Sequence, residues 1–204
     1  MSKTNIDNEM SELLNNDVFL VKEHVGLFKA ANNFDIYDPT SGEIIMECRE
    51  PTLGFITKLL RFTDFKKMTP FDIQIRTPDG DRIVRIKRDI SIFLSKIEVR
   101  DHENKLIGGF KQKLFSIGGK FDVLDPNDNV VCELAGQWTG WNFSFKQGET
   151  ELANVSKEWA GIGRELFTSA DNYVLTISNA VPQNDDTRKL ILAAVMCIDM
   201  VLKE

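Results

Sequence analysis

LILAAVMCIDMVL, residues 190–202, is apolar on every face of a helix and is interrupted only by Asp199. A helix that is apolar all round must be enclosed by protein or by lipid. The stretch is too short to cross a bilayer, which takes about 20 apolar residues. We therefore expect the rest of the protein to enclose it.

The residues before this stretch alternate between apolar and polar side chains, as strands do. A unit of strand, polar turn and strand recurs at 33–48, 70–88, 95–113, 119–136 and 141–159, with single strands at 19–28 and 171–180. The turn PDGD in the second unit is a strong hairpin signal. A sheet closed around a helix has no exposed edge and also explains the apolar helix. The sequence thus predicts a mainly β protein: a closed barrel of about twelve strands around a central, buried C-terminal α-helix, residues 185–203.

The chain reads as one domain, residues 17–204, after a polar and acidic leader, residues 1–16. This leader is expected to be flexible or weakly helical, with one helical turn in SELLNN (11–16). The N-terminal residues contain no apolar segment typical of a signal peptide. Three widely spaced cysteines, Cys48, Cys132 and Cys197, indicate reduced thiols in an intracellular protein. We expect a cytoplasmic location, with the periphery of a membrane as the alternative.

No combination of residues points to catalysis. The chain has two histidines, His24 and His102, and lacks the glycine-rich and nucleophile motifs of common enzymes. Its cysteines and histidines do not have the spacing of a zinc site. We therefore expect a protein that is not an enzyme and that has no cofactor and no metal.

Asp199 is the exception within the apolar stretch. An unpaired carboxylate in such surroundings is costly. We expect this side chain to be paired, hydrogen-bonded, protonated or placed where the helix emerges, with a structural role favoured over a catalytic one.

The charge is unevenly distributed. Residues 58–113 carry 14 Lys/Arg and 8 Asp/Glu, whereas the whole chain has a net charge of −6. The acidic balance argues against nucleic acid as a partner. The basic middle has two interpretations: a solvated surface in which charges of both signs intermix, or a site for an anionic phospholipid head group, with apolar contact from 52–68. The candidate binding residues are Lys58, Arg61, Lys66, Lys67, Arg85 and Lys87.

Two segments resemble phospholipid scramblases. VSKEWAGIGRELFTSADNYVLTI (155–177), followed by an apolar helix with Ile198 and Asp199, resembles their C-terminal part, and PFDIQIRTPDGDRIVRIKRDI (70–90) resembles an earlier strand pair. The resemblance covers most of residues 18–204. The same architecture is shared with LURP-one-related proteins and tubby C-terminal domains, and it implies a twelve-stranded barrel with the C-terminal helix through its centre.

The family also has a proposed calcium-binding stretch that begins Asp-Ala-Asp-Asn and ends in Asp. Here it reads SADNYVLTISNA (169–180), in which Asp171 and Asn172 match while Ser169 and Ala180 replace the terminal carboxylates. We expect this remnant to hold no calcium. The proline-rich region and palmitoylated cysteine cluster of animal members have no counterpart here.

Three functions follow as hypotheses. The first is a scramblase-related protein that binds anionic phospholipid head groups or a membrane-surface partner without turnover. The alternatives are a cytosolic protein-interaction module without a membrane role, and phospholipid scramblase activity itself.

Overall fold

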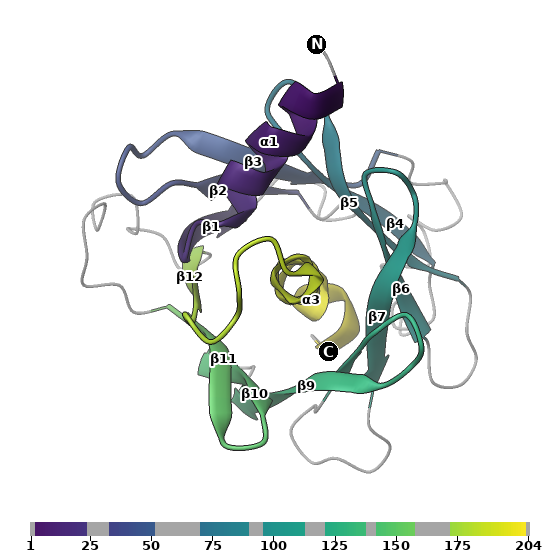
Figure 1. Ribbon diagram of the computed structural model, residues 1–204. Coiled ribbons are helices and arrows are strands. Elements are labelled where there is room, and N and C mark those ends of the chain that lie inside the picture. The colour runs from purple at the N-terminus through teal and green to yellow at the C-terminus, as the bar shows by residue number, and fades with distance from the viewer. Residues whose placement is uncertain are drawn as a thin grey trace.

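The computed structural model describes residues 3–23, 33–51, 70–89, 96–112, 121–137, 142–157 and 172–202, with side chains except at 3–7, 112, 137 and 198–202. Twelve strands form a ring, and helix α3 lies inside it (Figure 1). The elements are α1 (Lys3–Leu14), β1 (Val18–Glu23), β2 (Phe34–Tyr37), β3 (Ile44–Arg49), β4 (Phe71–Arg76), β5 (Arg82–Arg88), β6 (Lys96–Asp101), β7 (Leu106–Gln112), β8 (Phe121–Leu124), β9 (Val130–Gln137), β10 (Asn142–Gln147), β11 (Thr150–Ser156), β12 (Asn172–Ile177) and α3 (Asp186–Leu202).

The strands form a closed antiparallel barrel. Each strand pairs with its neighbours in the sequence, and β1 closes the ring by pairing with β12. Closure removes the exposed sheet edges that an open sheet would present to other chains. The predicted barrel of about twelve strands around a C-terminal helix is therefore confirmed.

The period-two pattern of the sequence sets which side chains face α3. In β4, Phe71, Ile73 and Ile75 are buried while the residues between them are half-buried. Every strand and α3 contribute buried apolar side chains to one hydrophobic cluster. The alternation thus places one apolar core inside the ring and a polar surface outside it.

A β-bulge follows the turn of each of the five described hairpins. In β5, for example, Val84 pairs with Ile75 and Arg82 pairs with Arg76, which leaves Ile83 as the extra residue. Extra residues at equivalent positions of the other hairpins are Ile45, Ile107, Val131 and Leu152. Ile83, Ile107 and Leu152 are buried, so the bulges add apolar side chains to the core near the turns.

The central helix begins with a side-chain cap. Asp185 Oδ1 accepts a 2.7 Å hydrogen bond from the Thr187 backbone N–H, which satisfies one free donor of the first turn. Residues Leu190 to Cys197 are all at most 7% exposed. The helix predicted at 185–203 is observed at Asp186–Leu202, and the Asp199 side chain lies outside the described part.

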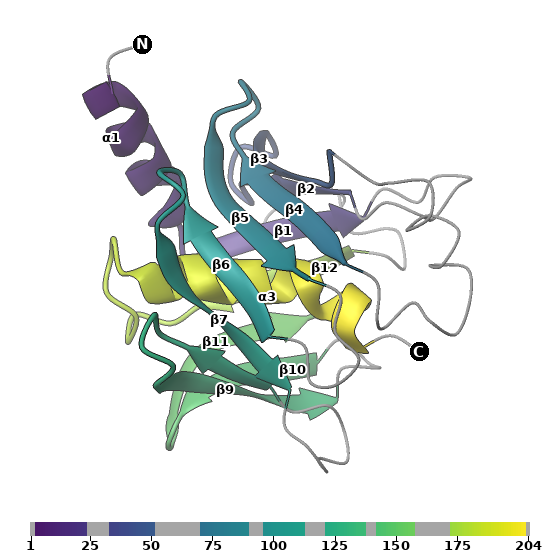
Figure 2. The same ribbon diagram turned by 90° about the vertical axis from the view of Figure 1, so that its right-hand side faces the viewer.

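Helix α1 covers the end of the barrel at which α3 begins (Figure 2). Met10 and Leu14 of α1 are buried in the core cluster. The sequence pattern predicted one helical turn at 11–16, whereas the observed helix has twelve residues, starts at Lys3 and ends at Leu14. Its C-terminal carbonyls are capped by the distant Arg188 of α3, a contact that local sequence does not reveal.

Candidate anion-binding surface

Of the six candidate cations, Arg85 and Lys87 lie within the described residues. Both are half-buried on β5, between the buried Val84, Ile86 and Arg88, so they face outward as the alternation predicted. Lys58, Arg61, Lys66 and Lys67 lie outside the described residues, as does the whole 52–68 stretch. Arg88 points inward, is 2% exposed and lies 4.7 Å from the centre of the Phe71 ring.

The strand register extends this surface beyond the two candidates. Arg85 of β5 lies directly opposite Arg100 of β6, and Lys96 of β6 lies directly opposite Lys111 of β7. We name these outward residues the cationic face: Arg85, Lys87, Lys96, Arg100 and Lys111. Like charges at directly opposed positions destabilise a sheet. The cationic face contains two such pairs in adjacent strands.

Carboxylates balance part of this charge. Arg85 makes two hydrogen bonds with Asp72, at 2.9 and 2.5 Å, and these raise the pKa of the Arg85 guanidinium. Three further ion pairs each have at least one exposed side chain: Lys87 with Asp89 at 2.9 Å, Lys96 with Asp128 at 2.5 Å and Arg100 with Glu98 at 3.0 Å. Charges of both signs therefore intermix here.

These exposed pairs can exchange partners. The side chains of Asp89, Asp128 and Glu98 are 81%, 60% and 42% exposed. An exposed ion pair contributes about 0–1 kcal/mol, because water competes for both charges. A multivalent anion can therefore replace these carboxylates at little cost in stability.

Sequence reasoning missed Lys96, Arg100 and Lys111. Their signal was present in the alternation of KIEVR (96–100) and in the outward position of Lys111 after the inward Phe110. The sequence pattern does not give the register between strands, and it is this register that places the cations of neighbouring strands opposite one another.

The described part of the remnant calcium stretch, residues 172–180, contains strand β12. Asn172 opens β12 and is buried, and this strand is hydrogen-bonded to β1 and to β11. A calcium loop instead wraps its oxygens around the ion. Asp171 lies outside the described residues. Across the part of the chain that is described, no group of three or more His, Cys, Asp or Glu side chains is placed to hold a metal ion.

The three thiols are buried in the barrel. Cys48 and Cys197 are at most 2% exposed, and burial raises the pKa of each thiol well above its usual value. Burial also raises the pKa of Cys132, to about 12. A thiol with such a pKa is protonated at neutral pH and is a poor nucleophile.

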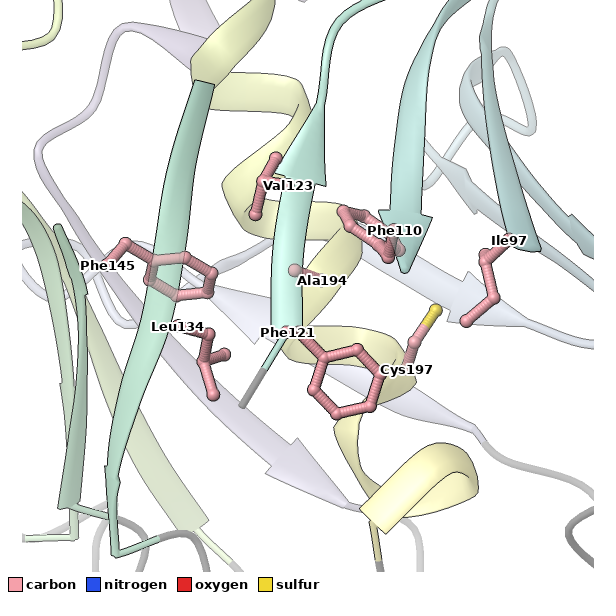
Figure 3. A pocket seen from close by; sticks show the side chains of 8 residues that line it. All are labelled: Ile97, Phe110, Phe121, Val123, Leu134, Phe145, Ala194 and Cys197. Carbon is pink, nitrogen blue, oxygen red and sulfur yellow. The ribbon is translucent and has the colours of Figure 1, made fainter. Parts of the chain in front are cut away.

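Two hollows adjoin α3 among the residues that the structure describes. An apolar cavity of about 20 Å³ lies between α3 and strands β6–β10, lined by Ile97, Phe110, Phe121, Val123, Leu134, Phe145, Ala194 and Cys197 (Figure 3). It has room for little more than one water-sized sphere, so it is a packing gap rather than a ligand site.

The second hollow is a cleft of about 310 Å³ between α1, the start of α3 and the turns. Met10, Leu14 and Ile83 give it an apolar floor, and His102 and Lys189 stand at its rim. His102 is the turn residue that the sequence indicated, and its carbonyl accepts a 3.0 Å hydrogen bond from Arg82. His24 lies outside the described residues.

Neither described helix combines the length and the hydropathy needed to span a membrane. A crystal structure of a protein from Arabidopsis thaliana is similar in fold, with a TM-score of 0.54 at 15% identity, over 94% of this chain and 95% of that one. Likeness at this identity supports the tubby-like fold alone.

The sequence comparisons go further. A phospholipid scramblase family protein of Schizosaccharomyces pombe is 21% identical over 224 residues, which cover 98% of this chain and 58% of the relative. The chain thus spans a little more than half the length of that relative. The family model described as Scramblase matches residues 2–204. On this match across nearly the whole chain, the protein belongs to the scramblase family.

Proposed function

We propose that this scramblase-related protein binds anionic phospholipid head groups on the cationic face, without making or breaking covalent bonds. One observation carries the proposal: the opposed cations Arg85–Arg100 and Lys96–Lys111. A phosphate or carboxylate group placed between two such cations offsets their repulsion.

The shape of the surface also supports this proposal. The five cations lie on three adjacent strands, and neighbouring strands are about 4.8 Å apart. Cations on adjacent strands of one barrel wall can contact more than one head group at once. Each cation near an anionic membrane surface contributes about 1 kcal/mol of binding energy. The name of the yeast relative, a phospholipid scramblase family protein, supports the same class of ligand.

A flotation assay with matched variants tests the proposal. The test variant is Lys96→Gln/Lys111→Gln, and the control is Lys22→Gln/Lys146→Gln, which removes two exposed lysines from β1 and β10. Vesicles of phosphatidylcholine with and without phosphatidylserine serve as the probe. We expect the test variant to bind anionic vesicles about 30-fold more weakly, from roughly 1 kcal/mol per lysine, and the control to change by less than threefold.

Added salt should weaken binding of the unchanged protein, because the contacts are electrostatic. Equal binding of the two variants would refute the cationic face as the site. If the unchanged protein fails to float at any salt concentration, the protein is not a lipid binder, and the alternative of a protein-interaction module is favoured.

Family membership supports a second candidate function, movement of phospholipids between leaflets. Reconstituted vesicles with a fluorescent lipid and a membrane-impermeant quencher measure it directly. Quenching beyond the outer-leaflet fraction would establish transfer. No increase over protein-free vesicles would leave head-group binding as the function.

A further inference from the structure

The cleft between α1 and the start of α3 has the size of a small-molecule site. Its volume of about 310 Å³ lies at the lower end of ligand pockets, which range from about 300 to 1,000 Å³. We call it the α1 cleft and describe it by its floor, Met10, Leu14 and Ile83, and by one rim, Asn184, Asp185 and Lys189. A cleft of this volume admits a small molecule but not a whole phospholipid.

The floor of the α1 cleft is apolar and held in place by the core. Met10, Leu14 and Ile83 are 4%, 5% and 1% exposed, and all three belong to the hydrophobic cluster of the barrel. Close packing in that cluster fixes their positions before any ligand arrives. A ligand that covers this floor with an apolar group is stabilised by removing that group from water.

Groups of opposite charge stand on the rim. Asp185 and Lys189 both line the cleft and are four residues apart, so they lie about one helical turn from each other. Asp185 Oδ1 caps the helix, whereas Oδ2 accepts no hydrogen bond from the residues that the structure describes. Lys189 pairs at 2.8 Å with Asp186, a carboxylate that is 50% exposed and for which water already competes. Both charges are therefore open to a ligand.

Asn184 adds a fixed donor beside them. Its Oδ1 accepts hydrogen bonds from the Ser11 hydroxyl and, at 3.1 Å, from Asn15 Nδ2, and its backbone N–H donates to Asn15 Oδ1 at 2.9 Å. These contacts with α1 hold the residue at a φ of +62°. Its Nδ2 has no acceptor within the described part of the chain, so its two N–H groups remain for a ligand.

From this combination we propose that the α1 cleft binds a small zwitterion with an apolar side chain, of which a free apolar α-amino acid is the simplest form. The ammonium group of the ligand pairs with Asp185 Oδ2. Its carboxylate accepts hydrogen bonds from Lys189 Nζ and Asn184 Nδ2, and its side chain covers the apolar floor.

The rim favours a zwitterion over an ion of one sign. A simple anion would face the carboxylate of Asp185, and a simple cation would face the ammonium of Lys189. Arg188 also lines the cleft, but its guanidinium is engaged with Asp17 and with backbone carbonyls near the end of α1. The α1 cleft shares no residue with the cationic face, so this inference goes beyond head-group binding and either one can fail without the other.

Calorimetric titration of the unchanged protein with matched ligands tests the proposal. L-Leucine is the probe; isocaproate lacks its ammonium group, isoamylamine lacks its carboxylate, and glycine lacks its side chain. We expect each of the three analogues to bind at least tenfold more weakly than L-leucine, because each leaves one part of the cleft without its partner. Equal affinity for L-leucine and any one analogue would overturn the proposed zwitterion site.

The absence of any binding would also overturn it. L-Leucine, L-methionine and L-phenylalanine at millimolar concentration should each raise the melting temperature, since a ligand that binds only the folded state stabilises it. If none of the three produces either heat on titration or a shift in melting temperature, the α1 cleft is not an amino-acid site.

Variants that remove one charge locate the ligand. Asp185→Asn keeps the helix cap, because asparagine caps as well as aspartate does, and Lys189→Gln removes the ammonium group. Asp79→Asn and Lys22→Gln are the controls, since each removes one exposed charge of the same sign outside the cleft. We expect each cleft variant to bind L-leucine at least tenfold more weakly and each control to change by less than twofold. Unchanged affinity in either cleft variant, shown to be folded by its urea transition, would overturn the proposed contacts.

Discussion

Arg188 of α3 donates a 2.8 Å hydrogen bond from its Nε to the backbone carbonyl of Leu14, 174 residues earlier in the chain. The same guanidinium donates to the carbonyls of Asn16 and Val181 and forms a 2.8 Å ion pair with Asp17. The carbonyls at the end of a helix have no partner within it. A buried arginine of the central helix therefore caps α1 and fixes it on the barrel.

Replacing Arg188 should release α1. We expect Arg188→Met to lower the free energy of unfolding by about 3 kcal/mol, because buried carbonyls lose charged donors. Amide hydrogen exchange in residues 8–14 should accelerate more than exchange in α3. Lys189→Met, at the half-buried neighbouring position, is the control and should change stability by about 0.5 kcal/mol or less. Unaltered exchange in α1 would contradict the capping role.

Gly108 should not tolerate a side chain. Its φ is +148°, and an added Cβ would lie 2.1 Å from the Leu124 carbonyl oxygen and 3.1 Å from Leu190 Cδ2 of α3. We expect Gly108→Ala to destabilise the protein by more than about 3 kcal/mol in urea unfolding. The control is Gly148→Ala, where φ is +58° and the space is open; about 1 kcal/mol is expected there. Equal losses of unfolding free energy in the two variants would show that the positive φ alone, and not the close approach of α3, destabilises Gly108→Ala.

Enlarging the cavity beside α3 should create a binding site for small apolar molecules. Leu134 is 2% exposed and lines the cavity, whereas Val130 of the same strand is 51% exposed. Leu134→Ala should cost about 2–5 kcal/mol, and Val130→Ala about 0.5 kcal/mol or less. Benzene should raise the melting temperature of the Leu134 variant and not that of the unchanged protein. No shift in either protein would mean that the barrel collapses around the deletion.

Stability should fall in alkali because of the buried thiols. Burial raises the pKa of Cys132 to about 12, above the usual value near 9, so the folded state holds this proton more tightly than the unfolded state does. The contribution is fully present below pH 9 and is lost as the pH rises toward 12. Each such thiol steepens the decline by about 1.4 kcal/mol per pH unit.

The comparison that isolates this effect is Cys132→Ala. Its unfolding free energy should be lower than that of the unchanged protein at pH 7, and the gap should narrow above pH 9. At neutral pH a thiol reagent should label the native protein at a small fraction of the rate seen in urea. A constant gap from pH 7 to pH 11 would show that Cys132 ionises equally in both states.

The sequence predicted the barrel because two of its patterns are local. The apolar stretch Leu190–Leu202 predicted a helix buried inside the protein. The alternating segments and their turns predicted the strands that surround it. Closure of β1 onto β12 and the docking of α1 by Arg188 are long-range, so no window of sequence contains them.

The candidate site was harder to predict, because it too depends on contacts between residues that are distant in sequence. The alternation of apolar and polar residues correctly predicted that Arg85 and Lys87 face outward. That Arg85 lies opposite Arg100 depends on the register between β5 and β6, which the alternation does not give. The carboxylates that balance these cations come partly from β4 and from the β8–β9 turn. Charge counted along the chain therefore overstated the excess of positive charge on the surface.

The ring has a consequence for how the protein is made. β1 pairs with β12 about 150 residues later, and α3, which the strands surround, is synthesised after all of them. A nascent chain on the ribosome can form hairpins, but it can neither join the first strand to the last nor fill the centre. Closure of the ring must then wait until α3 has been synthesised, and folding should be slow, because the contacts that complete the barrel are so distant in sequence.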